Sequence, residues 1–342
     1  MIPYAGKDEP VVHGGDLGAA RRLFPSAPEP FIDLSTGINP NPYPLPHFPA
    51  ELFARLPEPS AARELAAVAA RAYRAPSPAH VVPAPGTQIL LPLVAALVRP
   101  GRAAVLTPTY GEFARAAALA GHRARLVRAI EDCSDADLAM VANPNNPDGR
   151  LLSREALLAL AEALRRRGGV LAVDEAYMDV GPAGASLAPE VLRGNVVVLR
   201  SLGKFFGLAG MRLGFALAAP ALAARLGSVL GPWAVSGPAL AVGAKALADT
   251  DWIESTRSLL ANKVQRLDAM LGGSGLNIVG GTGLFRLVRT LKAGALFRHL
   301  GRAGIFVRTF PDNASWLRFG LPADEQGWQR LEAAMASFPG GE

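Results

Sequence analysis

The middle of the chain alternates short apolar runs with alanine- and leucine-rich stretches of helical character, and this alternation limits the fold more than any other feature. The apolar runs cover residues 81–82, 103–106, 138–141, 170–173 and 196–199. The helical stretches cover residues 61–73, 89–98, 112–120 and 153–167, the last with Ser153 as its predicted N-cap. Strands that alternate with helices pair in parallel, and the helices then cover both faces of the sheet. We therefore expect an α/β fold with a mostly parallel sheet.

The length of the chain predicts more than one domain. A chain of 342 residues exceeds the size that one hydrophobic core usually supports. Residues 45–225 contain the alternating pattern and form the predicted large domain. Residues 226–342 form a predicted small α+β domain, with a helix near 251–271 and strands near 283–288, 305–307 and 316–319. Residues 1–44 are predicted to be an irregular arm, since the first fifty residues are proline-rich and segment 39–46 cannot form a helix.

Composition excludes several classes of protein. A single cysteine, Cys133, excludes a disulfide framework and any cysteine-built metal site, and no metal is predicted. The net charge of +6 comes from scattered arginines, without the clustered basic face of a nucleic-acid-binding protein. The charge-free segment 226–244 contains four glycines and two prolines, which argue against a membrane span. Residues 1–10 lack a signal-peptide pattern, so we expect a cytoplasmic protein without nucleic-acid or membrane partners.

The strongest local signal is the segment 201–214, Ser-Leu-Gly-Lys-Phe-Phe-Gly-Leu-Ala-Gly-Met-Arg-Leu-Gly. Ser201 and Arg212 can converge on one anion, because a hydroxyl and a bidentate guanidinium together suit a phosphate dianion. Lys204 lies between them, and a partly desolvated lysine forms a Schiff base with an aldehyde. An aldehyde that carries its own phosphate is pyridoxal 5′-phosphate. The alternative is a glycine-rich turn with an exposed lysine.

Polar residues at other strand ends favour the same cofactor. Asp174 follows a buried strand, where a carboxylate can pair with a protonated pyridine nitrogen and keep the ring an electron sink. Tyr177 and Asn146 are placed to bond the ring oxygen, and Tyr110 to stack on the ring. Two further residues, Gly86 and Thr87, precede an apolar helix whose first N–H groups can hold a phosphate. Each has an ordinary alternative as a turn, cap or core residue, but their common strand-end position favours a cofactor site.

These motifs resemble those of fold-type I pyridoxal-phosphate enzymes of the class I/II aminotransferase family, over nearly the whole chain. The resemblance implies a large domain with a mostly parallel seven-stranded sheet, a smaller C-terminal α+β domain, and a homodimer with interfacial active sites. It implies that Lys204 carries the cofactor, that Asp174 pairs with the ring nitrogen, and that Arg318 binds the substrate carboxylate. It also implies the remaining contacts: Asn146 and Tyr177 at the ring oxygen, Tyr110 on the ring, and Gly86, Thr87, Ser201 and Arg212 at the phosphate.

Within this family, the N-terminal part resembles the threonine-phosphate decarboxylases of cobalamin biosynthesis more closely than the histidinol-phosphate aminotransferases. The resemblance rests on the segment 13–16, His-Gly-Gly-Asp, and on the segment 33–40. It implies decarboxylation of O-phospho-L-threonine to (R)-1-aminopropan-2-yl phosphate, with transamination as the alternative. One departure is Leu56, where family members often carry a tyrosine that reaches the neighbouring subunit's cofactor phosphate.

A phosphorylated amino acid presents two anionic ends, and the sequence offers a second arginine for the phosphate. Arg308 lies ten residues before Arg318, at the end of a predicted strand. We predict that Arg308 binds the substrate phosphate together with three groups of the arm: His13, the backbone of Gly14 and Gly15, and Asn39. The alternative is that Arg308 is an exposed strand-end residue and that the arm only packs.

A second class of function is a domain of this fold that binds an effector or DNA without turnover, as in fused transcription regulators. We expect no helix-turn-helix extension before the fold, and Lys204 is present, so the sequence favours an enzyme. Which bond breaks at the α-carbon depends on the one held perpendicular to the cofactor ring, and the sequence leaves decarboxylation and transamination both open.

Overall fold

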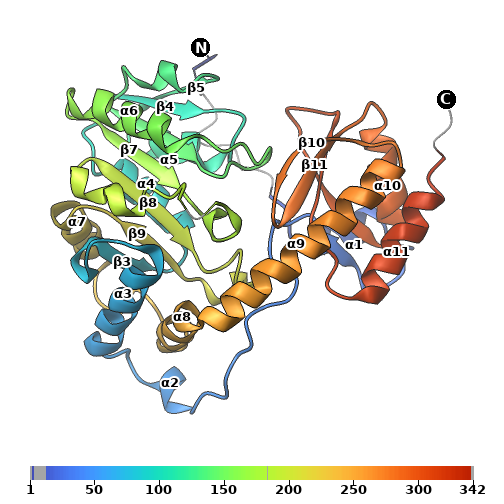
Figure 1. Cartoon of the computed structure of the whole chain (residues 1–342), viewed down its shortest axis with the longest axis horizontal. Helices are drawn as coiled ribbons and strands as arrows, with labels where there is room; N and C mark the ends of the chain where they lie inside the picture. Colours follow the sequence, from blue (N-terminus) through green and yellow to red (C-terminus); the bar gives the residue numbers. More distant parts are fainter. Residues whose placement is uncertain (1, 4–12, 183, 340–342) are drawn as a thin grey trace. The chain divides into compact units, whose positions relative to one another are not determined.

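The computed structural model describes residues 2–3, 13–182 and 184–339 and divides the chain into two compact units (Figure 1). The larger unit comprises residues 1–11, 43–146 and 150–253, and the smaller unit comprises residues 12–42, 147–149 and 254–342. This division differs from the predicted boundary after residue 225. The reason is that α8 (Gly237–Ala248) packs against α3 (Pro59–Tyr73) of the larger unit, and that residues 12–42 of the arm belong to the smaller unit.

The larger unit is built on a sheet with the strand order β1-β5-β4-β6-β7-β8-β9-β3. The five strands from β5 to β8 run parallel, whereas β9 is antiparallel to both of its neighbours. Strands β3 to β9 confirm the predicted seven-stranded sheet, and the two-residue β1 adds an antiparallel edge. The strand bounds are β1 Ile2–Pro3, β3 Val81–Ala84, β4 Arg102–Leu106, β5 Arg123–Val127, β6 Leu138–Ala142, β7 Val170–Asp174, β8 Val196–Ser201 and β9 Gly214–Leu217.

Helices cover both faces of this sheet, because its central strands are apolar on both sides. Leu138 and Met140 of β6 belong to a core cluster with side chains of α4, α5 and α7, whereas Val141 points to the opposite face and is equally buried. Burying each such side chain contributes about 1.5–3 kcal/mol. Ser153 caps α6 as predicted, since its Oγ accepts from the Ala156 N–H at 3.1 Å. The remaining helices of this unit are α2 Glu51–Ala54, α4 Thr87–Ala95, α5 Glu112–Leu119, α6 Arg154–Arg165 and α7 Pro220–Leu230.

The smaller unit contains a five-stranded sheet in the order β10-β11-β13-β12-β2. Strands β10 to β13 pair antiparallel, and β2 of the arm adds to β12 in parallel. The strand bounds are β2 Ile32–Leu34, β10 Asn277–Thr282, β11 Phe285–Arg289, β12 Ile305–Thr309 and β13 Trp316–Phe319. The helices are α1 Leu17–Leu23, α9 Thr250–Gly273, α10 Ala293–Arg302 and α11 Glu325–Ala336; the first residues of α9 belong to the larger unit.

The arm is more regular than predicted, because it contains α1 and β2. The segment from Asp16 to Phe24 contains no proline, and Asp16 Oδ1 accepts from the Ala19 N–H at 2.7 Å, which starts the helix. Strand β2 forms because its partner β12, far along the sequence, supplies the hydrogen bonds. The prediction of an irregular arm was therefore wrong for these two segments.

The charge-free segment 226–244 falls across the end of α7 and the start of α8. The break between them contains Gly231, whose φ of +72° ends α7, and Pro232. Among the residues that the structure describes, no helix combines the length and the apolar character that a membrane crossing requires.

Candidate active site

Several predicted cofactor residues of the larger unit lie at or just after the carboxyl ends of its parallel strands. Asp174 ends β7 and pairs in register with Ala142 of β6 and Leu199 of β8. Parallel strands end at one edge of a sheet, so Tyr110 after β4, Asn146 after β6 and Ser201 at the end of β8 share that edge with Asp174. Ligands of open α/β sheets bind at this edge.

Lys204 lies in the turn that follows β8. Its Nζ is 5.8 Å from the centroid of the Tyr177 ring, and the Tyr177 side chain is buried. Burial raises the pKa of Asp174, and the positive charge of Lys204 opposes that rise, so the two groups interact. The structure therefore brings together the three residues predicted to be catalytic.

Asp174 is held in an environment that penalises its charge. Burial raises the pKa of Asp174 to about 6, against the opposing effects of the Ala176 N–H, 3.0 Å from Oδ1, and of Lys204. A buried carboxylate of this kind is stabilised by a cation placed beside it. The pairing with a protonated ring nitrogen, predicted from the sequence, would supply that cation.

The start of α4 forms an anion cradle with Arg212. Gly86 occupies the N-cap position with a φ of +86°, and no side chain caps the helix, so its first N–H groups are open to a ligand. A Cβ at Gly86 would lie 2.6 Å from Arg212 Nη2, so only glycine lets the guanidinium approach this closely. Thr87 is the first residue of α4, and Ser201 is buried with its Oγ accepting from the Gly203 N–H at 3.2 Å.

Two residues that the sequence analysis missed hold Tyr110 and Asn146 in place. The Tyr110 hydroxyl donates to Gln88 Oε1 at 3.0 Å, and burial raises the pKa of Tyr110, which keeps the hydroxyl protonated. Asn145 is fully buried; it accepts from Thr109 Oγ1 and donates to the Pro108 carbonyl, both at 2.7 Å. It thereby ties the loop that carries Tyr110 to the loop that carries Asn146.

A buried ionic cluster supports the turn that contains Asp174 and Tyr177. Arg200 Nη1 donates to Glu175 Oε2 at 3.0 Å, and Arg200 Nη2 pairs with Asp179. Glu175 Oε1 also accepts from the Leu187 N–H at 2.6 Å. Buried charges are retained when they are paired and hydrogen-bonded, as here. The sequence signal was an arginine inside an apolar strand and a second acidic residue directly after Asp174.

In the smaller unit, the two predicted substrate arginines lie on neighbouring strands. Arg308 of β12 is in register with Arg318 of β13, so both side chains lie on the same face of the sheet. The Arg318 guanidinium lies 4.9 Å from the centroid of the Phe285 ring, and that of Arg308 lies 5.6 Å from the Phe310 ring. Two cations opposite each other repel unless anions lie nearby, so this face suits a ligand with more than one negative group.

The arm meets Arg318 at Ser35. The Gly15 N–H donates to Ser35 Oγ at 2.7 Å, and Arg318 Nη2 donates to the Ser35 carbonyl at 2.8 Å. A Cβ at Gly14 would lie 2.4 Å from the same carbonyl, so glycine is required there. The structure thus brings Gly14, Gly15 and Arg318 together, with Arg308 on the adjacent strand.

The other predicted residues of the arm differ in exposure. His13 is exposed, whereas Asn39 is buried and its Oδ1 accepts from the Asn41 N–H at 2.9 Å. In the larger unit Leu56, where family members often carry a tyrosine, lies just after α2 and is 65% exposed.

Comparison with known proteins identifies relatives along nearly the entire chain. A threonine-phosphate decarboxylase from Sinorhizobium sp is 42% identical over 338 residues, which cover 96% of this chain and 98% of the relative. The threonine-phosphate decarboxylase of Pseudomonas aeruginosa is 43% identical over 329 residues, 95% of this chain and 97% of the relative. A histidinol-phosphate aminotransferase from Vibrio parahaemolyticus is 32% identical over 235 residues, 64% of this chain and 68% of the relative.

The fold has solved counterparts. The crystal structure of histidinol-phosphate aminotransferase from Sinorhizobium meliloti in complex with pyridoxal-5′-phosphate matches with a TM-score of 0.79 at 24% identity, covering 97% of this chain and 96% of that chain. The family model for aminotransferase class I and II matches residues 53–331. The chain therefore belongs to the class I and II aminotransferase family.

Proposed function

We propose that this protein is a pyridoxal-phosphate-dependent decarboxylase that converts O-phospho-L-threonine to (R)-1-aminopropan-2-yl phosphate and CO2. The observation that carries the proposal is the pair of guanidiniums, Arg308 and Arg318, in register on one face of the small sheet. The proposed substrate has a carboxylate and a phosphate, one anion for each. The similarity to threonine-phosphate decarboxylases over nearly the whole chain, arm included, supports it.

The residues of the larger unit fit the proposed cofactor. The open N–H groups at the start of α4 and Arg212 suit its phosphate, and Gly86 leaves room for the guanidinium where a Cβ would fill it. Lys204 would hold the cofactor through its ε-amine, and Asp174 would hold the proton on the ring nitrogen. Asn146 and Tyr177 would bond the ring oxygen, Tyr110 would stack on the ring, and Ser201 would join the phosphate site. When bound, the cofactor supplies an electron sink for the bond broken at the α-carbon.

The proposed role of the smaller unit is to hold the two anionic ends of the substrate. Arg318 would bind the carboxylate, and Arg308 the phosphate, with His13, the Gly14 and Gly15 N–H groups, and Asn39. Fixing both ends limits rotation about the α-carbon, and that orientation decides whether CO2 or the α-proton is lost. The residues that orient the substrate therefore select which bond at the α-carbon breaks, a choice that Lys204 alone does not make.

Transamination is the second candidate reaction, because histidinol-phosphate aminotransferases also match. That match covers 64% of the chain, against 95–96% for the decarboxylases. The decarboxylases therefore share with this chain a larger part of the sequence, including regions outside the aminotransferase match.

We further propose that the protein is a cytoplasmic homodimer that acts in cobalamin biosynthesis. Support for a dimer comes from three large apolar side chains around α2 that remain exposed: Leu45 at 56%, Phe53 at 68% and Leu56 at 65%. Such a group is typical of a surface that a partner covers. Light scattering on the purified protein tests the dimer, and a monomer at micromolar concentration would contradict it.

One assay tests the proposed reaction. The protein loaded with pyridoxal phosphate is incubated with O-phospho-L-threonine while CO2 release is recorded, and in parallel with 2-oxoglutarate while keto-acid formation is recorded. We expect CO2 without dependence on 2-oxoglutarate. Keto-acid formation that requires 2-oxoglutarate, with no CO2, would replace the decarboxylase by the aminotransferase.

A further inference from the structure

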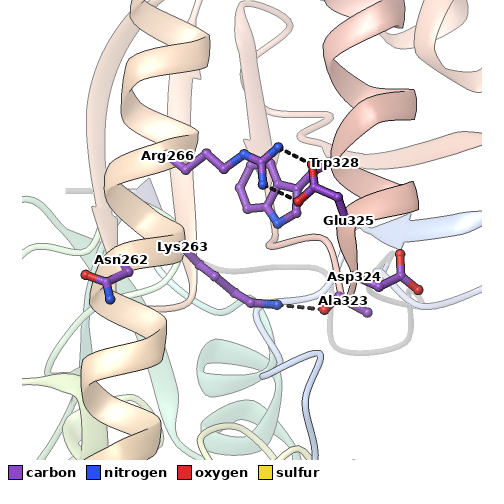
Figure 2. Close-up of a pocket in the computed structure, with 7 residues that line it drawn as sticks. All are labelled: Asn262, Lys263, Arg266, Ala323, Asp324, Glu325 and Trp328. Carbon is purple, nitrogen blue, oxygen red and sulfur yellow. Dashed lines mark hydrogen bonds and ion pairs between the residues drawn. The ribbon is translucent and has the colours of Figure 1, made fainter.

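Lys263 of α9 uses all three of its N–H donors within the smaller unit. Its Nζ donates to Asn41 Oδ1 at 2.6 Å, to the Pro322 carbonyl at 2.9 Å and to the Ala323 carbonyl at 2.7 Å. Figure 2 shows the side chain extended from α9 to Ala323. Burial lowers the pKa of Lys263. Ordering a long side chain in a partly buried position costs conformational entropy. Three short charge-assisted hydrogen bonds offset that cost and fix the position of the Lys263 ammonium group.

The acceptors of Lys263 belong to the two segments that carry predicted substrate residues. Asn41 lies two residues after Asn39, and its N–H donates to Asn39 Oδ1 at 2.9 Å. Pro322 and Ala323 follow β13, the strand of Arg318. Asn41 Nδ2 also donates to the Ala323 carbonyl at 3.2 Å. One ammonium group therefore connects the arm to the segment that leaves β13.

Arg266, three residues further along α9, has different partners. Its guanidinium binds Glu325 at 2.6 and 2.8 Å and Glu332 at 3.0 Å, and lies 4.6 Å from the Trp328 ring centroid. Both cations line the same cavity of about 290 Å³, and Figure 2 shows Arg266 directed at α11 and Lys263 at the preceding loop. Arg266 of α9 contacts residues of α11, whereas Lys263 also bonds to the arm, so Arg266 is a matched control for Lys263.

We propose that Lys263 is a positioning residue for the substrate, which holds the Asn39–Asn41 turn and the end of β13 in one arrangement. The proposal rests on the proposed function, because it concerns the residues assigned there to the substrate. It adds a residue that touches no substrate and acts through Asn41. The arm and β13 lie far apart in the sequence, and Lys263 bonds to both.

The test compares Lys263→Met with Arg266→Met, both loaded with cofactor. We expect Lys263→Met to raise KM for O-phospho-L-threonine by about tenfold with kcat within about twofold, since the lost bonds orient the substrate site and not the cofactor. Arg266→Met should lower the melting temperature and leave KM unchanged. Asn41→Ala should reproduce the KM effect, and the double variant Asn41→Ala/Lys263→Met should add little to it. Equal KM values in wild type and Lys263→Met, or an equal rise in both methionine variants, would overturn the proposal.

Hydrogen exchange separates this proposal from the proposed function. Amides of residues 36–39 and 41 should exchange faster in Lys263→Met than in wild type, and at the wild-type rate in Arg266→Met. Wild-type protein that releases no CO2 from O-phospho-L-threonine would remove the proposed function and leave the exchange result to test the link. Unchanged exchange in Lys263→Met would remove the link whatever the reaction is.

Discussion

The two groups of functional residues are built in different ways. In the larger unit, most residues assigned to the cofactor lie at or just after the ends of buried strands, so the strand ladder fixes their positions, whereas Arg212 lies in the segment between β8 and β9. In the smaller unit, the residues assigned to the substrate come from a proline-rich arm and two antiparallel strands, and side-chain bonds to Ser35 and Asn41 hold them. The comparison teaches that the first group depends on the core and the second on a few polar contacts. Substitutions should therefore have separable effects on cofactor chemistry and on substrate choice.

The largest expected effect concerns the larger unit. Lys204→Ala should abolish turnover and the visible absorbance of the bound cofactor, because the amine that would hold the cofactor is lost. Lys245→Ala, which removes an exposed lysine of α8, is the control and should behave as wild type. Turnover near the wild-type level in Lys204→Ala would contradict the covalent role and remove the distinction between the two groups.

The corresponding substitution in the smaller unit should alter selectivity. Arg308→Ala should lower kcat/KM for O-phospho-L-threonine by tens- to several hundredfold, which corresponds to about 2–4 kcal/mol in activation free energy, because a charge-assisted contact to the phosphate is lost. The rate on L-threonine, which has no phosphate, should change little. His13→Ala should show the same selectivity with a smaller loss. Equal losses on both substrates would show that Arg308 does not bind the phosphate.

Arg212→Ala sharpens the comparison, since it should affect cofactor binding alone. We expect the dissociation constant of pyridoxal phosphate to rise by tens- to several hundredfold, because the cradle at α4 loses its guanidinium. This rise corresponds to a loss of about 2–4 kcal/mol in binding free energy. With saturating cofactor, KM for O-phospho-L-threonine should remain close to that of wild type. An unchanged cofactor dissociation constant would show that Arg212 has another role.

The smallest expected effect is on stability. The pKa of Asp174 is raised to about 6, so between about pH 4, the unfolded value, and pH 6 the folded protein binds more protons than the unfolded chain. Ionised Asp174 therefore destabilises the cofactor-free protein above that range, by up to about 3 kcal/mol. Asp174→Asn should be more stable than wild type at neutral pH, and the advantage should shrink as pH falls through this range. Urea unfolding at several pH values measures it; a constant difference would contradict the assignment.

Sequence patterns singled out the residues assigned to the cofactor, but not the residues that hold them in place. Asp174, Lys204 and Arg212 stand at strand ends or in one glycine-rich segment, so local patterns suffice to find them. The structural roles of Arg200 and Asn145 were not predicted. An arginine inside an apolar run and an asparagine in a turn can be assigned a role only once their hydrogen-bond partners are known. Helix α1 was not predicted, because the prolines around it dominate the composition of the arm.

No local sequence pattern could predict the contacts that hold the residues assigned to the substrate. Arg318 meets Ser35 across 283 positions of sequence, and Lys263 meets Asn41 across 222. Neither pair has a spacing that a motif could encode, because tertiary structure alone brings its members together. The residues proposed to bind a ligand directly were predicted from local and family motifs, whereas the residues that hold them in place were found only in the structure.

The buried ionic cluster under the Asp174 turn has a consequence for how a ligand enters. Asp174, Glu175 and Asp179 carry three negative charges when ionised, against two positive charges on Arg200 and Lys204, which leaves an excess of one. Across the same unit, the N-terminus of α4 and Arg212 are positive. These two groups of charges create an electric field between them. In that field, a molecule with a cationic ring at one end and a dianion at the other has its lowest energy when the ring faces the carboxylates and the dianion faces the start of α4.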